Sequence, residues 1–81
     1  MSSGVISQLA WQCRRGMREL DELLLDFLEH QYAAAPATEK QAFRSLLQLS
    51  DAELMGYLLQ KEQPAAELAG VIKHILDRTH T

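Results

Sequence analysis

Apolar residues recur along the chain at the spacing of amphipathic helices, and the clearest case lies in its second quarter. There the apolar positions fall three and four residues apart, with acidic side chains between them. This is the pattern of a helix with one buried face. It predicts a central helix from about Met17 or Arg18 to about Ala34, because Pro36 disfavours helical geometry in the residue before it. The apolar positions are Leu20, Leu23, Leu24, Phe27 and Leu28.

A shorter stripe precedes it and predicts a first helix from about Val5 to Arg15. Gly16 follows two arginines, and basic residues before a glycine are typical of a helix end, since glycine adopts the left-handed conformation cheaply and cations favour the carbonyl end. We therefore expect Gly16 to end this helix with a positive φ angle, or to lie against a close backbone neighbour. The apolar positions are Val5, Ile6, Leu9, Ala10 and Cys13.

Three further helices are predicted in the second half of the chain. Thr38, followed three residues later by Gln41, indicates a capping box at the start of the third. Ser50 and Glu53 form a second and better capping box, which starts the fourth helix near Asp51. The apolar face of the third helix comprises Ala42, Phe43, Leu46, Leu47 and, at its edge, Leu49; that of the fourth comprises Leu54, Met55, Leu58 and Leu59.

The fourth helix is expected to run to about Lys61, and the fifth to about Arg78 with Pro64 in its first turn. The fifth stripe is Ala65, Leu68, Val71, Ile72, Ile75 and Leu76. No strand is predicted. Five short helices with short connections predict an all-α fold, a compact five-helix antiparallel bundle. It forms a single domain over residues 1–81 that is ordered from about 5 to 78.

Composition narrows the class of protein. A chain of 81 residues buries only about 60 to 65% of the surface that its unfolded form exposes, so its core is thin. Its single cysteine cannot form an intramolecular disulfide, and no Cys/His pair has zinc-ligand spacing, so no metal is expected. The first residues lack a secretory or mitochondrial signal pattern, and no apolar run approaches the roughly 20 residues of a membrane span. A bacterial cytoplasm is the expected location, with no membrane insertion.

Catalysis finds little support in the sequence. No glycine-rich G-x-G-x-x-G fingerprint is present, so we predict no FAD or NAD site in this chain and no cofactor of its own. The histidines, His30, His74 and His80, lie on predicted polar faces or at the terminus and are expected to be surface residues. Cys13 lies on an apolar stripe and is expected to be a buried, inert thiol.

A cluster of arginines is the sharpest chemical feature. Arg14, Arg15 and Arg18 surround Gly16 in a chain whose formal net charge is −3. With Glu19, these residues form what we call the arginine corner. The arginines either solvate a helix end and offset its dipole or make forked contacts with the carboxylates or carbonyls of a protein partner. If the chain is helical through Gly16, Arg15 and Glu19 share a face and can pair; if it bends there, both project from the corner.

Trp11 lies off the best apolar stripe of the first helix. It is either an interface anchor at the rim of the arginine corner or part of the core. Arg15 and Glu19 are both expected to lie outside the core, so that truncating them changes partner binding far more than stability.

The stretch RRGMRELD, residues 14–21, resembles the signature of the SdhE (YgfY) family of small helical assembly factors. The family pattern R-G-x-x-E is matched by Arg15, Gly16 and Glu19. The chain departs from the family at Leu28, where a second aromatic residue is common, and at Tyr57, where tryptophan is usual. Further family patterns, F-x-E-H-x-Y, F-x-x-L-L and D-x-x-L, fall on residues 27–32, on Phe43, Leu46 and Leu47, and on Asp51 and Leu54.

The resemblance implies a five-helix FAD assembly factor without catalytic residues. Such a protein, expected to be a monomer, binds the flavoprotein subunit of succinate dehydrogenase, often that of fumarate reductase too. The implied outcome is a covalent bond between a histidine of that subunit and the FAD methyl carbon. The expected partner-binding residues are Trp11, Arg14, Arg15, Gly16, Arg18 and Glu19.

Two other functions stay open from the sequence. One is a flavin transferase that itself holds FAD, which the missing phosphate loop disfavours. The other is a nucleic-acid-binding or antitoxin-like interaction module, in line with the antitoxin label (CptB) that family members also carry. Nucleic-acid binding fits poorly with a net charge of −3, because such affinity comes mostly from a broad basic face.

Overall fold

The computed structural model describes residues 2–60 and 62–77, and within them it contains five helices and no strand. The all-α, five-helix prediction is therefore confirmed. None of these helices is long and apolar enough to cross a membrane. They are α1 (Ser2–Cys13), α2 (Arg18–His30), α3 (Ala37–Leu46), α4 (Asp51–Leu58) and α5 (Ala66–Leu76).

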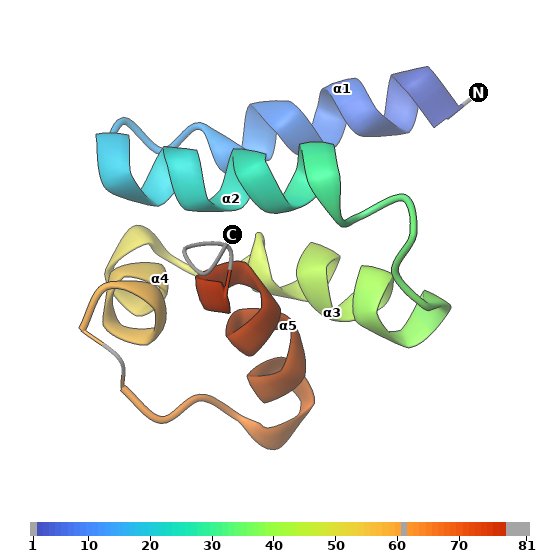
Figure 1. Cartoon of the computed structure of the whole chain (residues 1–81). Helices are drawn as coiled ribbons and strands as arrows, with labels where there is room; N and C mark the ends of the chain where they lie inside the picture. The colour runs from blue at the N-terminus through green and yellow to red at the C-terminus, as the bar shows by residue number, and fades with distance from the viewer. Residues whose placement is uncertain (1, 61, 78–81) are drawn as a thin grey trace.

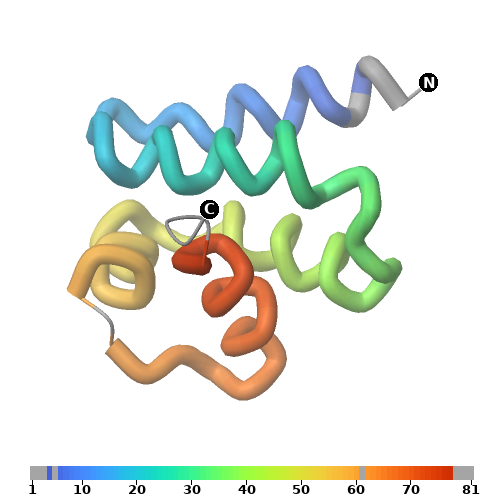
Figure 2. Tube along the Cα trace, viewed as in Figure 1, coloured from blue at the N-terminus to red at the C-terminus, as the bar shows by residue number. Residues whose placement is uncertain are grey.

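The helices form two parts that share one core. Helices α1 and α2 make an antiparallel hairpin, and α3 runs back beneath α2 in the view of Figure 1. Helices α4 and α5 run across these three, as the tube trace in Figure 2 also shows. Helix α2 packs against α1, α4 and α5, and α5 also packs against α3 and α4. Helix α2 is thus the central helix, as its apolar stripe predicted.

The predicted stripes supply most of the core, but the predictions for Ile6 and Ala65 are wrong, because both residues are exposed. All five apolar positions of α2 are buried, and so are Leu68, Val71, Ile72 and Ile75 of α5. Two aromatic contacts join α2 and its following turn to α3: the ring centroids of Phe27 and Phe43 lie 4.8 Å apart, and those of Tyr32 and Phe43 lie 5.7 Å apart. Burying these rings stabilises the α2–α3 packing by more than their area alone.

The first helix ends earlier than predicted. It stops at Cys13 instead of Arg15, and Arg14 donates its backbone N–H to the Trp11 carbonyl at 3.1 Å. Gly16 has a φ of +85°, so the positive angle is confirmed, but it lies within the connection and not directly after the helix. The helix stops because the next two backbone N–H groups, those of Arg15 and Gly16, donate to the Asp21 carboxylate instead of to α1 carbonyls.

The end of α2 also differs from the prediction. The helix stops at His30, and residues 31–34, which were predicted to continue it, form a non-helical turn. The Phe27 carbonyl accepts from the N–H groups of both Gln31 and Tyr32, each at 2.9 Å. The widened turn brings the Tyr32 ring onto Phe43, so tertiary packing of one aromatic side chain overrides the helix propensity of the alanines that follow.

The two predicted capping boxes have opposite outcomes. The one at Thr38 is wrong: α3 begins at Ala37, and its N-cap is Pro36, which makes no side-chain cap bond. Proline needs no hydrogen-bond partner for its nitrogen, and its fixed φ starts the helix two residues earlier. The box at Ser50 is confirmed, since Ser50 Oγ accepts from the Glu53 N–H at 3.2 Å and the Glu53 carboxylate accepts from the Ser50 N–H at 3.2 Å.

The last two helices are shorter than predicted. Helix α4 ends at Leu58, before Lys61, which lies outside the described residues. Helix α5 begins at Ala66, so Pro64 precedes the helix instead of occupying its first turn. It ends at Leu76, and the predicted end at Arg78 lies outside the described residues.

Candidate functional site

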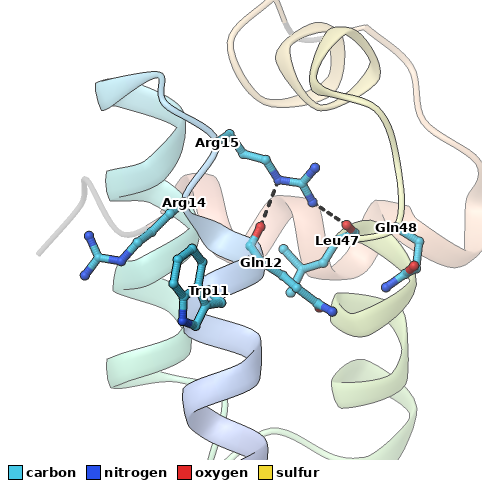
Figure 3. A pocket seen from close by; sticks show the side chains of 6 residues that line it. All are labelled: Trp11, Gln12, Arg14, Arg15, Leu47 and Gln48. Carbon is cyan, nitrogen blue, oxygen red and sulfur yellow. Dashed lines mark hydrogen bonds between the residues drawn. The ribbon is translucent and has the colours of Figure 1, made fainter.

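The arginine corner divides two neighbouring arginines between the surface and the interior. Figure 3 shows the side chains of Arg14 and Arg15 extending in opposite directions from the end of α1. Arg14 is exposed and makes no side-chain hydrogen bond or ion pair with the described residues. The side chain of Arg15 is only 16% exposed. Adjacent residues of the same type therefore have different roles in this structure.

The Arg15 guanidinium lies against the α3–α4 connection. Its Nε donates to the Gln12 carbonyl at 2.8 Å, and Nη2 donates to the Leu47 carbonyl. Its Nη1 donates to the Leu49 carbonyl at 3.2 Å and lies 3.3 Å from the Asp51 carboxylate. These contacts engage most of the five N–H donors of a guanidinium. Arg15 therefore ties the end of α1 to a segment more than 30 residues further along the chain.

Asp21 closes the α1–α2 connection from the other side. Its Oδ1 accepts from the Arg15 backbone N–H at 2.7 Å and its Oδ2 from the Gly16 N–H at 3.3 Å. The residue lies in the first turn of α2, where a carboxylate is also favoured by the helix dipole. Both the backbone and the side chain of Arg15 are thus fixed by contacts within the protein.

These contacts surround an open hollow of about 290 Å³. Trp11 lies at its rim and is 76% exposed, so of the two interpretations of this residue the structure excludes packing in the core. Arg14 lies beside it (Figure 3). We call this feature the Trp11 hollow; its lining residues are Trp11, Gln12, Arg14, Arg15, Leu47 and Gln48.

The remaining residues of the arginine corner lie on the first turn of α2. The side chain of Arg18 is 91% exposed and pairs with Glu22 at 3.5 Å, one turn further along the helix. Glu19 is exposed, as expected. The chain bends at Gly16, so the helical alternative, in which Glu19 would pair with Arg15, does not apply. The expectation for a bent chain is wrong for Arg15, because its guanidinium turns inward to backbone carbonyls instead of projecting from the corner.

Sequence reasoning missed the residues that hold the corner. Asp21 is part of the RRGMRELD stretch, but it lies six positions after Arg15, a spacing that matches no helical or turn pattern. Asp51 is predicted at the start of the fourth helix and in the D-x-x-L pattern but not as a partner of Arg15, and the carbonyls of Leu47 and Leu49 leave no signal in a sequence. Only the Arg15–Asp21 proximity could have been found locally, from an acidic residue just after a glycine turn.

The other candidate residues have structural surroundings. Cys13 is fully buried, as predicted, and burial raises the pKa of its thiol to about 12. His30 and His74 are exposed, as predicted, while His80 lies outside the described residues. His74 has a partner that was not predicted: its Nδ1 lies 2.7 Å from Glu39 Oε2. The described residues contain no group of three His, Cys, Asp or Glu side chains placed to hold a metal.

Comparison with known proteins places the chain in a family. The sequence model of the family described as "Flavinator of succinate dehydrogenase" matches residues 7–79. A Pseudomonas aeruginosa protein named FAD assembly factor SdhE is 38% identical over 74 residues, which are 90% of this chain and 88% of that protein. Proteins of the same name from Yersinia pseudotuberculosis and Pectobacterium atrosepticum are 40% and 41% identical over 73 residues, 89% of this chain and 83% of each relative. The chain therefore belongs to the family of succinate dehydrogenase flavinators, to which its arginine-rich signature had pointed.

Proposed function

We propose that this chain is an FAD assembly factor that, as a monomer, binds the flavoprotein subunit of succinate dehydrogenase, and that of fumarate reductase, and promotes covalent attachment of FAD to it. Family membership over residues 7–79 carries the proposal. The names of the relatives, which are similar to this chain over most of their length, point to the same function.

The proposed partner-binding surface is Trp11 together with the exposed residues of the arginine corner, Arg14, Gly16, Arg18 and Glu19. Tryptophan and arginine are the residue types most enriched among the side chains that dominate protein interfaces. Trp11 is the most exposed of the large hydrophobic side chains in the described part of the chain, and it lies beside Arg14 on an open hollow. Arg18 and Glu19 extend this surface along the first turn of α2.

The proposed contribution is conformational. An assembly factor can hold the flavoprotein so that the reacting groups of the subunit and of FAD lie in attack geometry, and such positioning alone can account for a large rate increase. Cys13, the only thiol of the chain, is buried with a pKa raised to about 12, so it is protonated and covered at neutral pH. This supports a helper that supplies no nucleophile of its own.

Flavin fluorescence of the denatured flavoprotein subunit tests the proposal. The subunit is produced with and without this chain, and covalently bound flavin is detected in the gel. We expect the wild-type chain to raise the signal and Trp11→Ala to lose this effect, because truncating an anchoring tryptophan commonly weakens binding by at least about 2 kcal/mol, roughly thirtyfold. Ile6→Ala, which trims the other exposed large hydrophobic residue of α1, is the matched control and should act like the wild type.

Two results would contradict the proposal. Flavinylation that does not respond to the wild-type chain would rule out the assembly role. Normal flavinylation with Trp11→Ala, with the variant shown to be folded by circular dichroism, would move the docking surface away from the Trp11 hollow.

A further inference from the structure

Two segments that are distant in sequence line the Trp11 hollow. Trp11 and Arg14 come from the end of α1, whereas Leu47 and Gln48 come from the end of α3 and the connection that follows it. Its shape therefore depends on how these two segments are held together. The hydrogen bonds of Arg15 to the carbonyls of Leu47 and Leu49 span that junction.

Arg15 can span the junction only if its own backbone is held in place. Two successive N–H groups, those of Arg15 and Gly16, converge on the Asp21 carboxylate. Convergent backbone N–H groups of this kind form a concave anion site. Here the anion comes from the chain itself, and it fixes the left-handed conformation of Gly16 in the same turn.

Both side chains are committed to contacts inside the protein. The Arg15 guanidinium is 16% exposed and is bonded to three backbone carbonyls and one carboxylate. Asp21 is half-buried, and each of its carboxylate oxygens accepts one backbone N–H. Most of the N–H donors of Arg15, and one acceptor site on each Asp21 oxygen, are therefore already used inside the protein.

We infer that Asp21 and Arg15 are positioning residues of the partner-binding surface: they set the placement of Trp11 and Arg14 against the α3–α4 connection and do not themselves contact the flavoprotein. The inference rests on the proposed function. It makes Asp21 a determinant of flavoprotein binding although it presents nothing to the partner, and it changes the role of Arg15 from a docking contact to an internal support.

Calorimetric titration with the FAD-loaded flavoprotein subunit tests the inference, together with a measurement on the free chain. Trp11 is the only tryptophan, so quenching of its fluorescence by iodide reports its surroundings directly. We expect Asp21→Ala to change the quenching constant of the free chain and to raise the Kd at least about tenfold, since small displacements of positioned groups cost factors of this size. Asp21→Asn keeps one carbonyl acceptor and should return the Kd to within about threefold of the wild type.

A general loss of stability is separated from positioning by a matched variant. Ile72→Val removes one methyl group from a buried position of α5 and destabilises the chain without touching the corner. It should leave both the Trp11 quenching and the Kd unchanged. A Kd raised equally by Ile72→Val would overturn the inference, because binding would then follow stability alone.

The remaining outcomes are also decisive. An unchanged Kd with Asp21→Ala, while the wild type binds, overturns the inference and leaves the proposed function intact. A raised Kd with unchanged Trp11 quenching overturns it too, because Asp21 would then contact the partner directly. If Asp21→Ala does not fold, the same two criteria apply to Arg15→Lys, which keeps the positive charge but loses the forked contacts with the carbonyls of Leu47 and Leu49. A wild-type chain that does not bind the flavoprotein contradicts the proposed function itself.

Discussion

Two polar clusters join distant parts of the chain, and they differ in the number of hydrogen bonds that one side chain makes and in the kind of acceptor. At the arginine corner, Arg15 is largely buried and donates mainly to backbone carbonyls. Between α3 and α5, His74 lies 2.7 Å from Glu39, and Gln31 donates to the His74 carbonyl at 3.3 Å. The side chain of His74 is half exposed. We call this second cluster the α3–α5 pair.

The difference between the two clusters indicates which polar contacts fix the relative positions of distant segments. Water can replace an exposed contact at little cost, whereas a partly buried carbonyl that loses its donor stays unsatisfied. Helices α3 and α5 also pack directly on each other, so the α3–α5 pair adds to contacts that exist without it. Helix α1, in contrast, packs mainly on α2. The hydrogen bonds that join the end of α1 to the α3–α4 connection come from the Arg15 side chain.

Truncating Arg15 should have the largest effect. We expect Arg15→Ala to lower the free energy of unfolding by at least about 2 kcal/mol, because several hydrogen bonds to a charged donor are lost and carbonyls are left unpaired. Arg14→Ala, the neighbouring control, should change it by no more than about 0.5 kcal/mol. Urea unfolding followed by circular dichroism measures both. Equal effects of the two variants would show that the corner is not held as described.

Changing the turn itself should come next. Gly16→Val is expected to cost about 1 to 2 kcal/mol, because a branched side chain is strained at a φ of +85°. No atom lies within 4 Å of where its Cβ would be, so the cost comes from the backbone and not from a clash. Gly16→Asn should cost less, since asparagine tolerates the left-handed region. Thermal unfolding compares them, and an equal loss from both would argue against backbone strain as the cause.

Removing a local support beside the corner should cost somewhat less. Ser50→Ala deletes the side-chain cap of α4 next to the carbonyls that Arg15 contacts, and the expected loss of stability is about 1 kcal/mol. Ser50→Thr retains the hydroxyl and serves as the control. Chemical denaturation of both variants is the measurement. A Ser50→Ala chain as stable as Ser50→Thr would mean that Arg15, and not the cap, holds the start of α4.

The smallest effect is expected from the α3–α5 pair. Glu39→Gln removes the charge but keeps an acceptor for His74, and it should change the stability by no more than about 0.5 kcal/mol, because the half-exposed imidazole can also bond to water. Unfolding at low and high salt should also give nearly the same value. A loss comparable to that of Arg15→Ala would remove the distinction between the two clusters.

The sequence by itself determined the features that depend on neighbouring residues. The apolar stripe of α2 became the centre of the core, because helical periodicity requires only residues three and four apart. The box between Ser50 and Glu53 formed because both partners lie within one turn. The positive φ of Gly16 follows from the absence of a side chain. The stretch that carries the resemblance to the family, residues 14–21, is local as well.

Only the tertiary structure determined the features that depend on contacts between residues distant in sequence. The end of α2 depended on Tyr32 reaching Phe43, and the entry to α3 on Pro36 instead of Thr38. The inward direction of Arg15 depended on carbonyls more than 30 residues away. No rule based on residue type or spacing can distinguish Arg14 from Arg15, because they are adjacent residues of the same type. Arg15 alone turns inward, because the folded chain places unpaired carbonyls and the Asp21 carboxylate around it, whereas Arg14 faces solvent beside Trp11.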